Sequence, residues 1–224
     1  MVHRQYENLL LRDLPDGGVP SRRQACSDAR GRPLNHADDG CEVSFSPDGF
    51  VFSTNHAYHP GQEIYVSYGK HSNDFLLAEY GFLLAENRWD EVCLDDVILP
   101  KMDMTQMAQL EERGFLGHYM LDTEHLGCHR TQVALRLLCR AQGQWHKFVD
   151  TGDAADDVDS QPAVDVLLME LLNGFLEVID KTLGDIGKVQ VDQQAQRTML
   201  EQRWKQIARM VEHAVLRLRS RTVS

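Results

Sequence analysis

The chain has 224 residues, of which 42% are hydrophobic and 25% are charged, and its formal net charge at pH 7 is -11. This size and composition suit one or two modest cores. The sequence shows neither an apolar run of membrane-spanning length nor the apolar core of a signal peptide. We therefore expect a cytoplasmic or nuclear protein that does not associate with a membrane. The acidic balance argues against direct nucleic-acid binding and suits contact with basic, lysine-bearing protein segments.

The cysteines and the N-terminal segment add little. The five cysteines are odd in number and widely spaced, which supports neither a disulfide framework nor a zinc ribbon. Residues 1–33 are rich in Arg, Asp, Gly and Pro, and we leave them unassigned and expect disorder. The following residues contain the first recognisable elements.

A hairpin is predicted first. Two alternating segments, Glu42 to Phe45 and Phe50 to Thr54, flank the turn sequence Ser46-Pro47-Asp48-Gly49. Pro and Gly stand where turn geometry favours them. We therefore expect two antiparallel strands here.

A tyrosine is predicted at the junction of a strand and a helix. Glu63 to Val66 alternates polar and apolar residues, which indicates a strand buried on one face. Tyr68 follows it, Gly69 permits a sharp turn, Ser72 is a good N-cap, and the helix that begins there should stop at Gly81. By itself such a tyrosine is as well explained as a half-buried packing residue whose hydroxyl reaches water.

After Pro100 the pattern is helical. We expect three helices, at Met104 to Glu112, at Thr131 to Ala141 with Gly143 as its stop, and from Pro162 to about Leu183. A last helix carries one apolar stripe at Leu200, Trp204, Ile207, Val211, Ala214 and Leu218. The stripe can face the interior of a helical bundle or a partner, and we favour the interior.

Several of these motifs occur together in one known order. Asn35-His36, the hairpin, Gly-Gln-Glu-Ile-x-Val-x-Tyr-Gly and Ser-Asn-x-Phe-Leu-Leu-x-x-Tyr-Gly-Phe resemble the C-terminal half of a SET domain. The resemblance is to the branch that methylates the Rubisco large subunit and related substrates. It implies an α+β fold, with a partial SET-type β core at 34–99 and an all-α helical bundle at 100–224.

The resemblance also implies roles for four residues. Asn35, His36 and Tyr68 would face S-adenosylmethionine and the target nitrogen, with Tyr68 as the catalytic residue. Phe75 would pack near the adenine of the cofactor. No metal is implied, and His36 with its acidic neighbours is better explained by the Asn-His motif than by a metal site.

The downstream helices continue the resemblance. Arg130 to Leu138 and Arg203 to Ile207 are similar to the helical domain that helps to dock the protein substrate in this branch, so the likeness covers roughly Asn35 to Ser220. In the family the glycine-rich cofactor loop lies far before Asn-His, and we expect either a truncated chain without that N-terminal half or a divergent gene product. Asp150, Asp153, Asp156, Asp157 and Asp159 lack the spacing of a calcium loop and are interpreted as a solvated, mobile loop.

Two functions of different classes remain open. The first is a SET-type methyltransferase that uses S-adenosylmethionine to methylate a protein, with lysine as the expected acceptor and histidine as an alternative. The second is a catalytically inactive SET remnant in which the helical domain serves as a protein-interaction module. An incomplete core would expose strand edges and apolar surface, so self-association is also expected.

Overall fold

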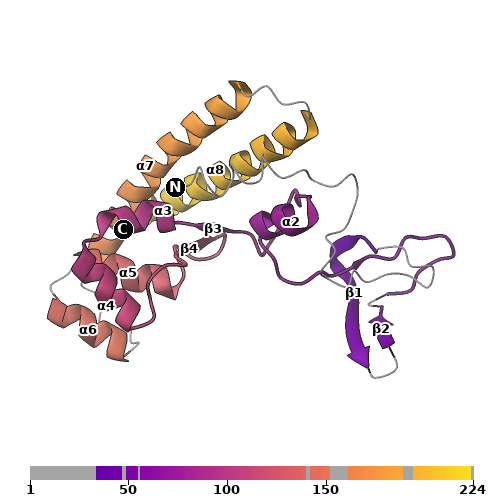
Figure 1. Cartoon of the computed structure of the whole chain (residues 1–224), viewed down its shortest axis with the longest axis horizontal. Coiled ribbons are helices and arrows are strands. Elements are labelled where there is room, and N and C mark those ends of the chain that lie inside the picture. The colour runs from indigo at the N-terminus through magenta and orange to yellow at the C-terminus, as the bar shows by residue number, and fades with distance from the viewer. Residues whose placement is uncertain are drawn as a thin grey trace. The chain divides into compact units, whose positions relative to one another are not determined.

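The computed structural model describes residues 34–46, 49–54, 56–139, 142–151, 161–188 and 194–222 (Figure 1). The chain divides into two compact units between Trp89 and Asp90, earlier than the boundary expected at Pro100. Helices and two small antiparallel sheets confirm the α+β class. The expectation for residues 1–33 falls outside the described part of the chain.

The first unit begins with the predicted hairpin. Strand β1 (His36–Ser46) pairs antiparallel with β2 (Gly49–Ser53), with Glu42 opposite Ser53. The strand prediction is confirmed, whereas the turn at 47–48 is not described. β1 begins well before its paired stretch, and this early part contacts a different segment.

The predicted strand at Glu63 to Val66 is wrong. Only Val66 forms bridges, to His36 and Cys41. Ile64 and Tyr65 are 38% and 37% exposed, so the alternating pattern does not place a continuous buried face. Alternation of polar and apolar residues predicts a strand only where a neighbouring strand lies alongside it. Within 63–66, such a neighbour is present among the described residues at Val66 alone.

The segment that carries Val66 crosses the start of β1. The Val66 amide donates to the Asn35 carbonyl at 2.9 Å, the Cys41 amide to the Tyr65 carbonyl at 2.8 Å, and the Ser67 amide to the Cys41 carbonyl at 3.2 Å. These backbone hydrogen bonds hold together two segments that are far apart in the sequence.

Gly40 lies at the closest point of this crossing. A Cβ atom added there would lie 2.6 Å from the Val66 carbonyl carbon and 2.9 Å from the Ser67 backbone nitrogen. Atoms of the backbone cannot move aside as a flexible side chain can. The crossing therefore depends on a residue without a side chain at this position.

Helix α2 (Asn73–Tyr80) follows as the sequence predicts. The Ser72 side chain accepts a hydrogen bond from the Phe75 amide, and the helix ends at Gly81 with a φ of 75°. Inside the unit, the buried Asn73 side chain exchanges two hydrogen bonds with the Leu84 backbone at 3.0 and 3.1 Å. This contact holds the segment after α2 against the start of the helix.

The second unit is built mainly from helices around one apolar core (Figure 1). In chain order its elements are β3 (Glu91–Cys93), α3 (Asp95–Ile98), η1 (Leu99–Lys101), α4 (Met104–Glu112), β4 (Met120–Asp122), α5 (His129–Cys139), α6 (Gln142–Thr151), α7 (Gln161–Lys188) and α8 (Gln194–Thr222). β3 and β4 pair antiparallel. The expected helical bundle is present, and it also includes this small sheet.

The prediction for α4 is confirmed at both ends, and Asp103 and Gln106 form a capping box at its start. The prediction that Gly143 ends a helix is wrong, because Gly143 lies within α6. In that helix Trp145 is fully buried, and its Nε1 donates to the Val133 carbonyl at 3.0 Å. Burial of a large aromatic side chain outweighs the roughly 1 kcal/mol by which glycine disfavours a helix.

The two long helices confirm the other expectations. α7 begins beside Pro162 as predicted but continues past Leu183 to Lys188, and Ile186 in this extension is buried. α8 contains the whole predicted stripe, and all six of its residues are buried in the core. The interior reading of the stripe is therefore correct.

A buried ion pair explains why the helical unit begins at Asp90. Arg203 Nη1 of α8 lies 2.6 Å from Asp90 Oδ2, and the two side chains are 0% and 6% exposed. Arg203 Nη2 also donates to the Glu91 carbonyl at 3.2 Å. The start of β3 is thus bound to α8, ahead of the composition change at Pro100.

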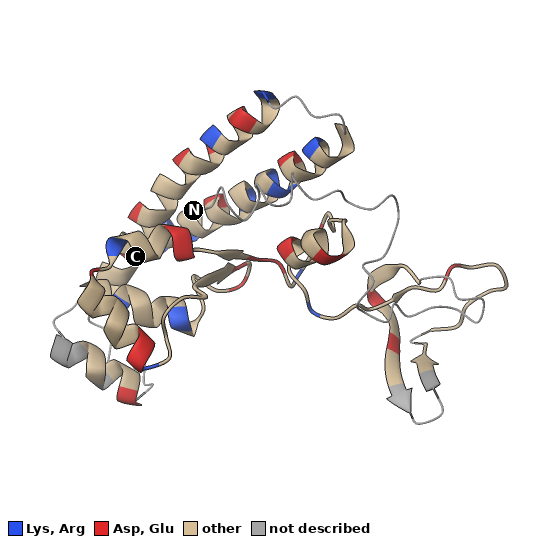
Figure 2. Cartoon of the chain, in the orientation of Figure 1, with Lys and Arg blue, Asp and Glu red and all other residues tan. Residues whose placement is uncertain are grey.

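Both long helices contain acidic and basic residues along their length (Figure 2). None of the described helices combines the length and apolar character that crossing a membrane requires.

Candidate active site

Tyr68 is held by the residues around Asn35. Its backbone amide donates to His36 Nδ1 at 3.1 Å, and its hydroxyl donates to the Leu34 carbonyl at 2.6 Å. The His36 and Tyr68 ring centroids lie 5.1 Å apart. The tyrosine is therefore fixed at both its backbone and its hydroxyl end by one short stretch of chain.

Asn35 presents its side chain beside a carboxylate. Asn35 Nδ2 donates to Glu63 Oε1 at 2.6 Å, and the Tyr65 hydroxyl donates to Glu63 Oε2 at 2.8 Å. The hydrogen bond to Glu63 raises the pKa of the Tyr65 phenol. Glu63 was not singled out from the sequence, and it lies next to the predicted residue only because the two segments cross.

His36 is placed to remain neutral. Partial burial lowers the pKa of its imidazole from the ordinary value of 6.5, while a hydrogen bond with the Val66 backbone and the charge of Asp38 oppose that shift. Nδ1 can accept the Tyr68 amide hydrogen only when that nitrogen is unprotonated. Burial and the hydrogen bond therefore favour the same protonation state.

An aromatic cluster surrounds the Tyr68 ring. Tyr80 lies 4.6 Å and Phe82 6.3 Å from it between ring centroids, and Phe82 lies 5.8 Å from His36. The left-handed turn at Gly81 separates the two added rings. Both rings belong to the Tyr-Gly-Phe motif of the sequence, which was the available signal, but neither ring was predicted to be part of the site.

Phe75 reaches this cluster through the Tyr80 ring. Its ring stacks on His71 with centroids 4.0 Å apart and lies 6.3 Å from the Tyr80 ring. Of the predicted residues, His36 thus contacts Tyr68 directly, Asn35 lies next to His36 in the chain, and Phe75 approaches Tyr68 through Tyr80. Its predicted place beside an adenine remains an expectation.

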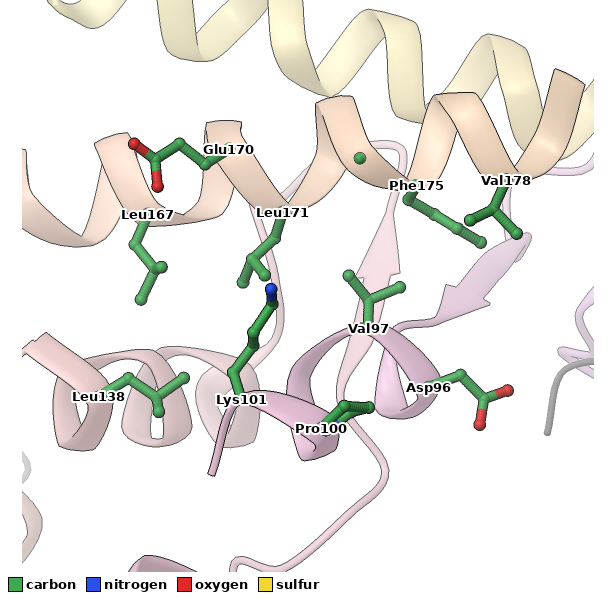
Figure 3. Close-up of a pocket in the computed structure, with 11 residues that line it drawn as sticks. Asp96, Val97, Pro100, Lys101, Leu138, Leu167, Glu170, Leu171, Phe175 and Val178 are labelled. Atoms are coloured by element: carbon green, nitrogen blue, oxygen red, sulfur yellow. The ribbon is translucent and has the colours of Figure 1, made fainter. Parts of the chain in front are cut away.

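The helical unit has a groove of its own, of about 630 Å³ (Figure 3). Its apolar lining comes mainly from α7, with contributions from α3, η1 and the end of α5. The residues that line it are Asp96, Val97, Pro100, Lys101, Leu138, Leu167, Glu170, Leu171, Gly174, Phe175 and Val178. Figure 3 shows the carboxylates of Asp96 and Glu170 toward opposite ends, with Lys101 between them.

The chain is similar in sequence to two proteins named as lysine methyltransferases. No family model matches the chain. It is 31% identical over 129 residues to ribosomal lysine N-methyltransferase 2 of Saccharomyces cerevisiae, covering 56% of this chain and 26% of that protein. It is 36% identical over 78 residues to ribosomal lysine N-methyltransferase set11 of Schizosaccharomyces pombe, covering 35% of this chain and 20% of that protein.

Solved structures give a weaker likeness. Rubisco LSMT bound to sinefungin and monomethyllysine superposes with a TM-score of 0.47 at 15% identity, over 83% of this chain and 49% of that one. The SET domain of LSMT bound to lysine and AdoHcy gives 0.49 at 16% identity, over 87% and 53%. The sequence relatives confirm the resemblance to lysine methyltransferases, and the chain spans about a quarter of the length of the first of them.

Proposed function

We propose that the chain acts as a SET-type protein-lysine N-methyltransferase that uses S-adenosylmethionine. The observation that carries this proposal is the convergence of Asn35, His36 and Tyr68 through hydrogen bonds between distant segments, from Val66 to the Asn35 carbonyl and from Tyr68 to the His36 ring and the Leu34 carbonyl. The sequence similarity to two proteins named as lysine methyltransferases supports the same reaction.

The residues present suit this cofactor chemically. The Glu63 carboxylate can pair with an ammonium group, and the Asn35 amide next to it can bind a carboxylate or an ammonium. The faces of Tyr68, Tyr80 and Phe82 offer π systems to which a sulfonium cation is attracted. When bound, S-adenosylmethionine supplies the methyl group to be transferred.

Tyr68 would act as a hydrogen-bond acceptor. Because its hydroxyl hydrogen is directed to the Leu34 carbonyl, the oxygen can offer only lone pairs to a further group. Those lone pairs can orient an amine N–H or stabilise positive charge near the transferred methyl group. The contribution of Tyr68 is therefore positioning and electrostatic stabilisation rather than covalent catalysis.

The aromatic surroundings would also favour the neutral, reactive form of the lysine amine that accepts the methyl group. A lysine amine has a pKa near 10.4 in water and must lose its proton before nitrogen can attack. Rings such as Tyr80 and Phe82 exclude water, and desolvation favours the neutral amine. As the nitrogen–methyl bond forms, the carbon–sulfur bond of the sulfonium would break and its electron pair would stay on sulfur, so that a neutral thioether leaves and a methylammonium ion remains. The one proton released is the proton lost before attack.

The two relatives are named for ribosomal lysine methylation, and we propose a lysine of a ribosomal protein as the substrate. The groove of the helical unit is the described hollow best suited to hold an apolar side chain of such a substrate. The carboxylates of Asp96 and Glu170 would face its basic flanks, in keeping with the chain's charge of -11.

The first test is calorimetric titration of the chain with S-adenosylmethionine. We expect binding that Asn35→Ala weakens at least tenfold and that Tyr119→Phe leaves unchanged. Tyr119 is a matched control because it is a buried tyrosine of the helical unit whose hydroxyl has no hydrogen-bond partner among the described residues.

The second test is transfer of labelled methyl groups to ribosomal proteins, with mass spectrometry to identify the modified residue. Tyr68→Phe should abolish transfer while the protein stays folded, and Tyr119→Phe should retain it. Full activity of Tyr68→Phe would exclude the proposed role of Tyr68. Label found on histidine instead of lysine would identify histidine as the methyl acceptor.

The alternative is a non-catalytic interaction module. A folded chain that fails to bind S-adenosylmethionine would favour it, and the groove in Figure 3 would then be the surface to probe.

A further inference from the structure

A second pocket of the helical unit concentrates positive charge in an acidic protein. It has a volume of about 310 Å³ and lies among the loop after β4 and helices α5, α6, α7 and α8. Among the described residues that line it, Arg136, Arg217 and Arg221 are cationic and Glu124 alone is acidic. This balance opposes the net charge of -11 of the whole chain.

Arg136 forms the floor of this pocket. The residue is only 3% exposed, yet it belongs to the pocket lining. Its Nη1 donates to Gln132 Oε1 at 2.7 Å, its Nη2 donates to Gln161 Oε1 at 2.6 Å, and its guanidinium carbon lies 4.4 Å from the Phe148 ring centroid. These contacts orient the guanidinium within the pocket, and a donor group that is already oriented loses less freedom when an anion binds.

The pocket wall from α8 holds two further arginines in different ways. Arg217 donates to the carbonyls of Thr123 and Glu124 at 3.3 and 2.8 Å, which fixes the loop after β4. Arg221 has a side chain that is 51% exposed, and its Nη1 lies 3.8 Å from Asp165 Oδ2, beyond hydrogen-bond distance. Asp165 Oδ1 accepts a 2.6 Å hydrogen bond from Gln161 Nε2, so Arg221 can turn toward a ligand while Asp165 keeps this contact.

Two helices begin at the same pocket. α5 starts at His129 and α7 starts at Gln161, and both residues belong to the lining. The N-terminal ends of helices carry partial positive charge and backbone N–H groups. They add to the field of the arginines at this position.

We propose that this pocket binds a phosphate group. A guanidinium presents paired N–H donors that match the oxygens of phosphate, and a tetrahedral dianion can engage several arginines at once. The bound group can be a free phosphate or the phosphate of a modified side chain. The proposal is independent of methyl transfer, since all its contacts lie within the helical unit and its test requires no S-adenosylmethionine.

The test is titration of the full chain with inorganic phosphate, and separately with N-acetyl-phosphoserine methylamide, at constant ionic strength set with chloride. We expect saturable binding and a rise in the thermal midpoint of the helical unit that acetate does not reproduce. Arg221→Gln should weaken phosphate binding at least fivefold. Arg209→Gln, which changes an exposed arginine of the same helix outside the pocket, should leave it unchanged.

The two probes also identify the source of the phosphate. Binding of inorganic phosphate alone would indicate a free ligand, whereas tighter binding of the phosphoserine compound would indicate a modified protein. No saturable binding of either probe, equal stabilisation by acetate, or equal loss in the Arg209 and Arg221 variants would overturn the proposal. Circular dichroism of both variants checks that neither has lost its helices.

Discussion

The two units hold their shapes by different means. In the helical unit, buried apolar side chains form one core that extends from Val92 to Leu218. In the unit before Asp90, the buried apolar residues that the structure describes are Cys41, Val66, Leu76 and Leu77. Burial of apolar surface is the main favourable term in folding. We therefore expect the helical unit to have the larger intrinsic stability.

The unit with the candidate active site relies on directional contacts instead. Backbone hydrogen bonds at the crossing of 35–41 with 65–67, the buried amide of Asn73 and the rings around Tyr68 fix its geometry. Such contacts each contribute about 1 kcal/mol, and they specify positions more than they add stability. We therefore expect that the geometry of the candidate active site can be lost while the helical unit remains folded.

The largest effect is expected in the helical unit, from Arg203→Met. Asp90 would lose the guanidinium that lies 2.6 Å away in a buried environment, and breaking such a pair destabilises by about 3–5 kcal/mol. Urea unfolding followed by far-ultraviolet circular dichroism measures the loss. Arg209→Met, on the exposed face of the same helix, should change stability by less than about 0.5 kcal/mol.

Replacing both partners sharpens this test. Asp90→Leu combined with Arg203→Met should recover much of the stability, since neither charge is then buried. If the double variant is as unstable as Arg203→Met, packing of the long side chain rather than the ion pair is responsible.

Gly40→Ala should act on the other unit. The new Cβ would meet the Val66 backbone at 2.6 Å, and forcing this contact apart should destabilise the crossing by about 1–3 kcal/mol. Amide hydrogen exchange at Val66 and Ser67 should accelerate while exchange in α7 and α8 stays unchanged. Gly184→Ala is the matched control in α7, where an added Cβ meets nothing within 4 Å, and it should not accelerate exchange in either unit.

A smaller effect is expected at the start of α4. Asp103→Ala removes the side-chain oxygen that accepts from the Gln106 amide at 2.8 Å, at a cost of about 1 kcal/mol of helical-unit stability. Glu111→Ala, at an exposed position of the same helix, is the control for lost charge. Exchange at Tyr68 should be the same in both variants, and a change there would contradict the separation of the two units.

The smallest effect is a pH dependence confined to the unit with the candidate active site. The folded protein holds the pKa of His36 below its ordinary value of 6.5, so between the two values the unfolded chain binds more protons than the folded one. The stabilising contribution is complete above pH 6.5 and is lost as the pH falls through the lowered pKa. Hydrogen exchange at the Tyr68 amide, corrected for its intrinsic pH dependence, should accelerate over this range.

His36→Gln should remove that dependence, because the glutamine oxygen can accept from Tyr68 without titrating. His59→Gln, at an exposed position, should retain it. An unchanged pH profile in His36→Gln would assign the effect to another group.

The residues near Asn35 and Tyr68 show which neighbours a sequence motif can predict and which it cannot. The family resemblance of their motifs implied that they would lie together, and Tyr68 donates hydrogen bonds to His36 and to the Leu34 carbonyl, the two neighbours of Asn35 in the chain. The same sequence did not indicate that Glu63 would bind Asn35 or that Tyr80 would pack on Tyr68. Those neighbours arise from the crossing and from the turn at Gly81, which involve residues distant from one another in the sequence.

By itself, the sequence determined the elements whose signals are local. Ser72 and Gly81 mark the two ends of α2, the segment from Met104 to Glu112 forms α4, and the apolar stripe defines the buried face of α8, because caps and helical periodicity act within a few residues. The tertiary structure alone decided that 63–66 does not continue as a strand, that Gly143 lies inside a helix, and that Asp90 joins the helical unit. Each of these outcomes depends on a partner far along the chain, whose burial or hydrogen bond outweighs a local preference.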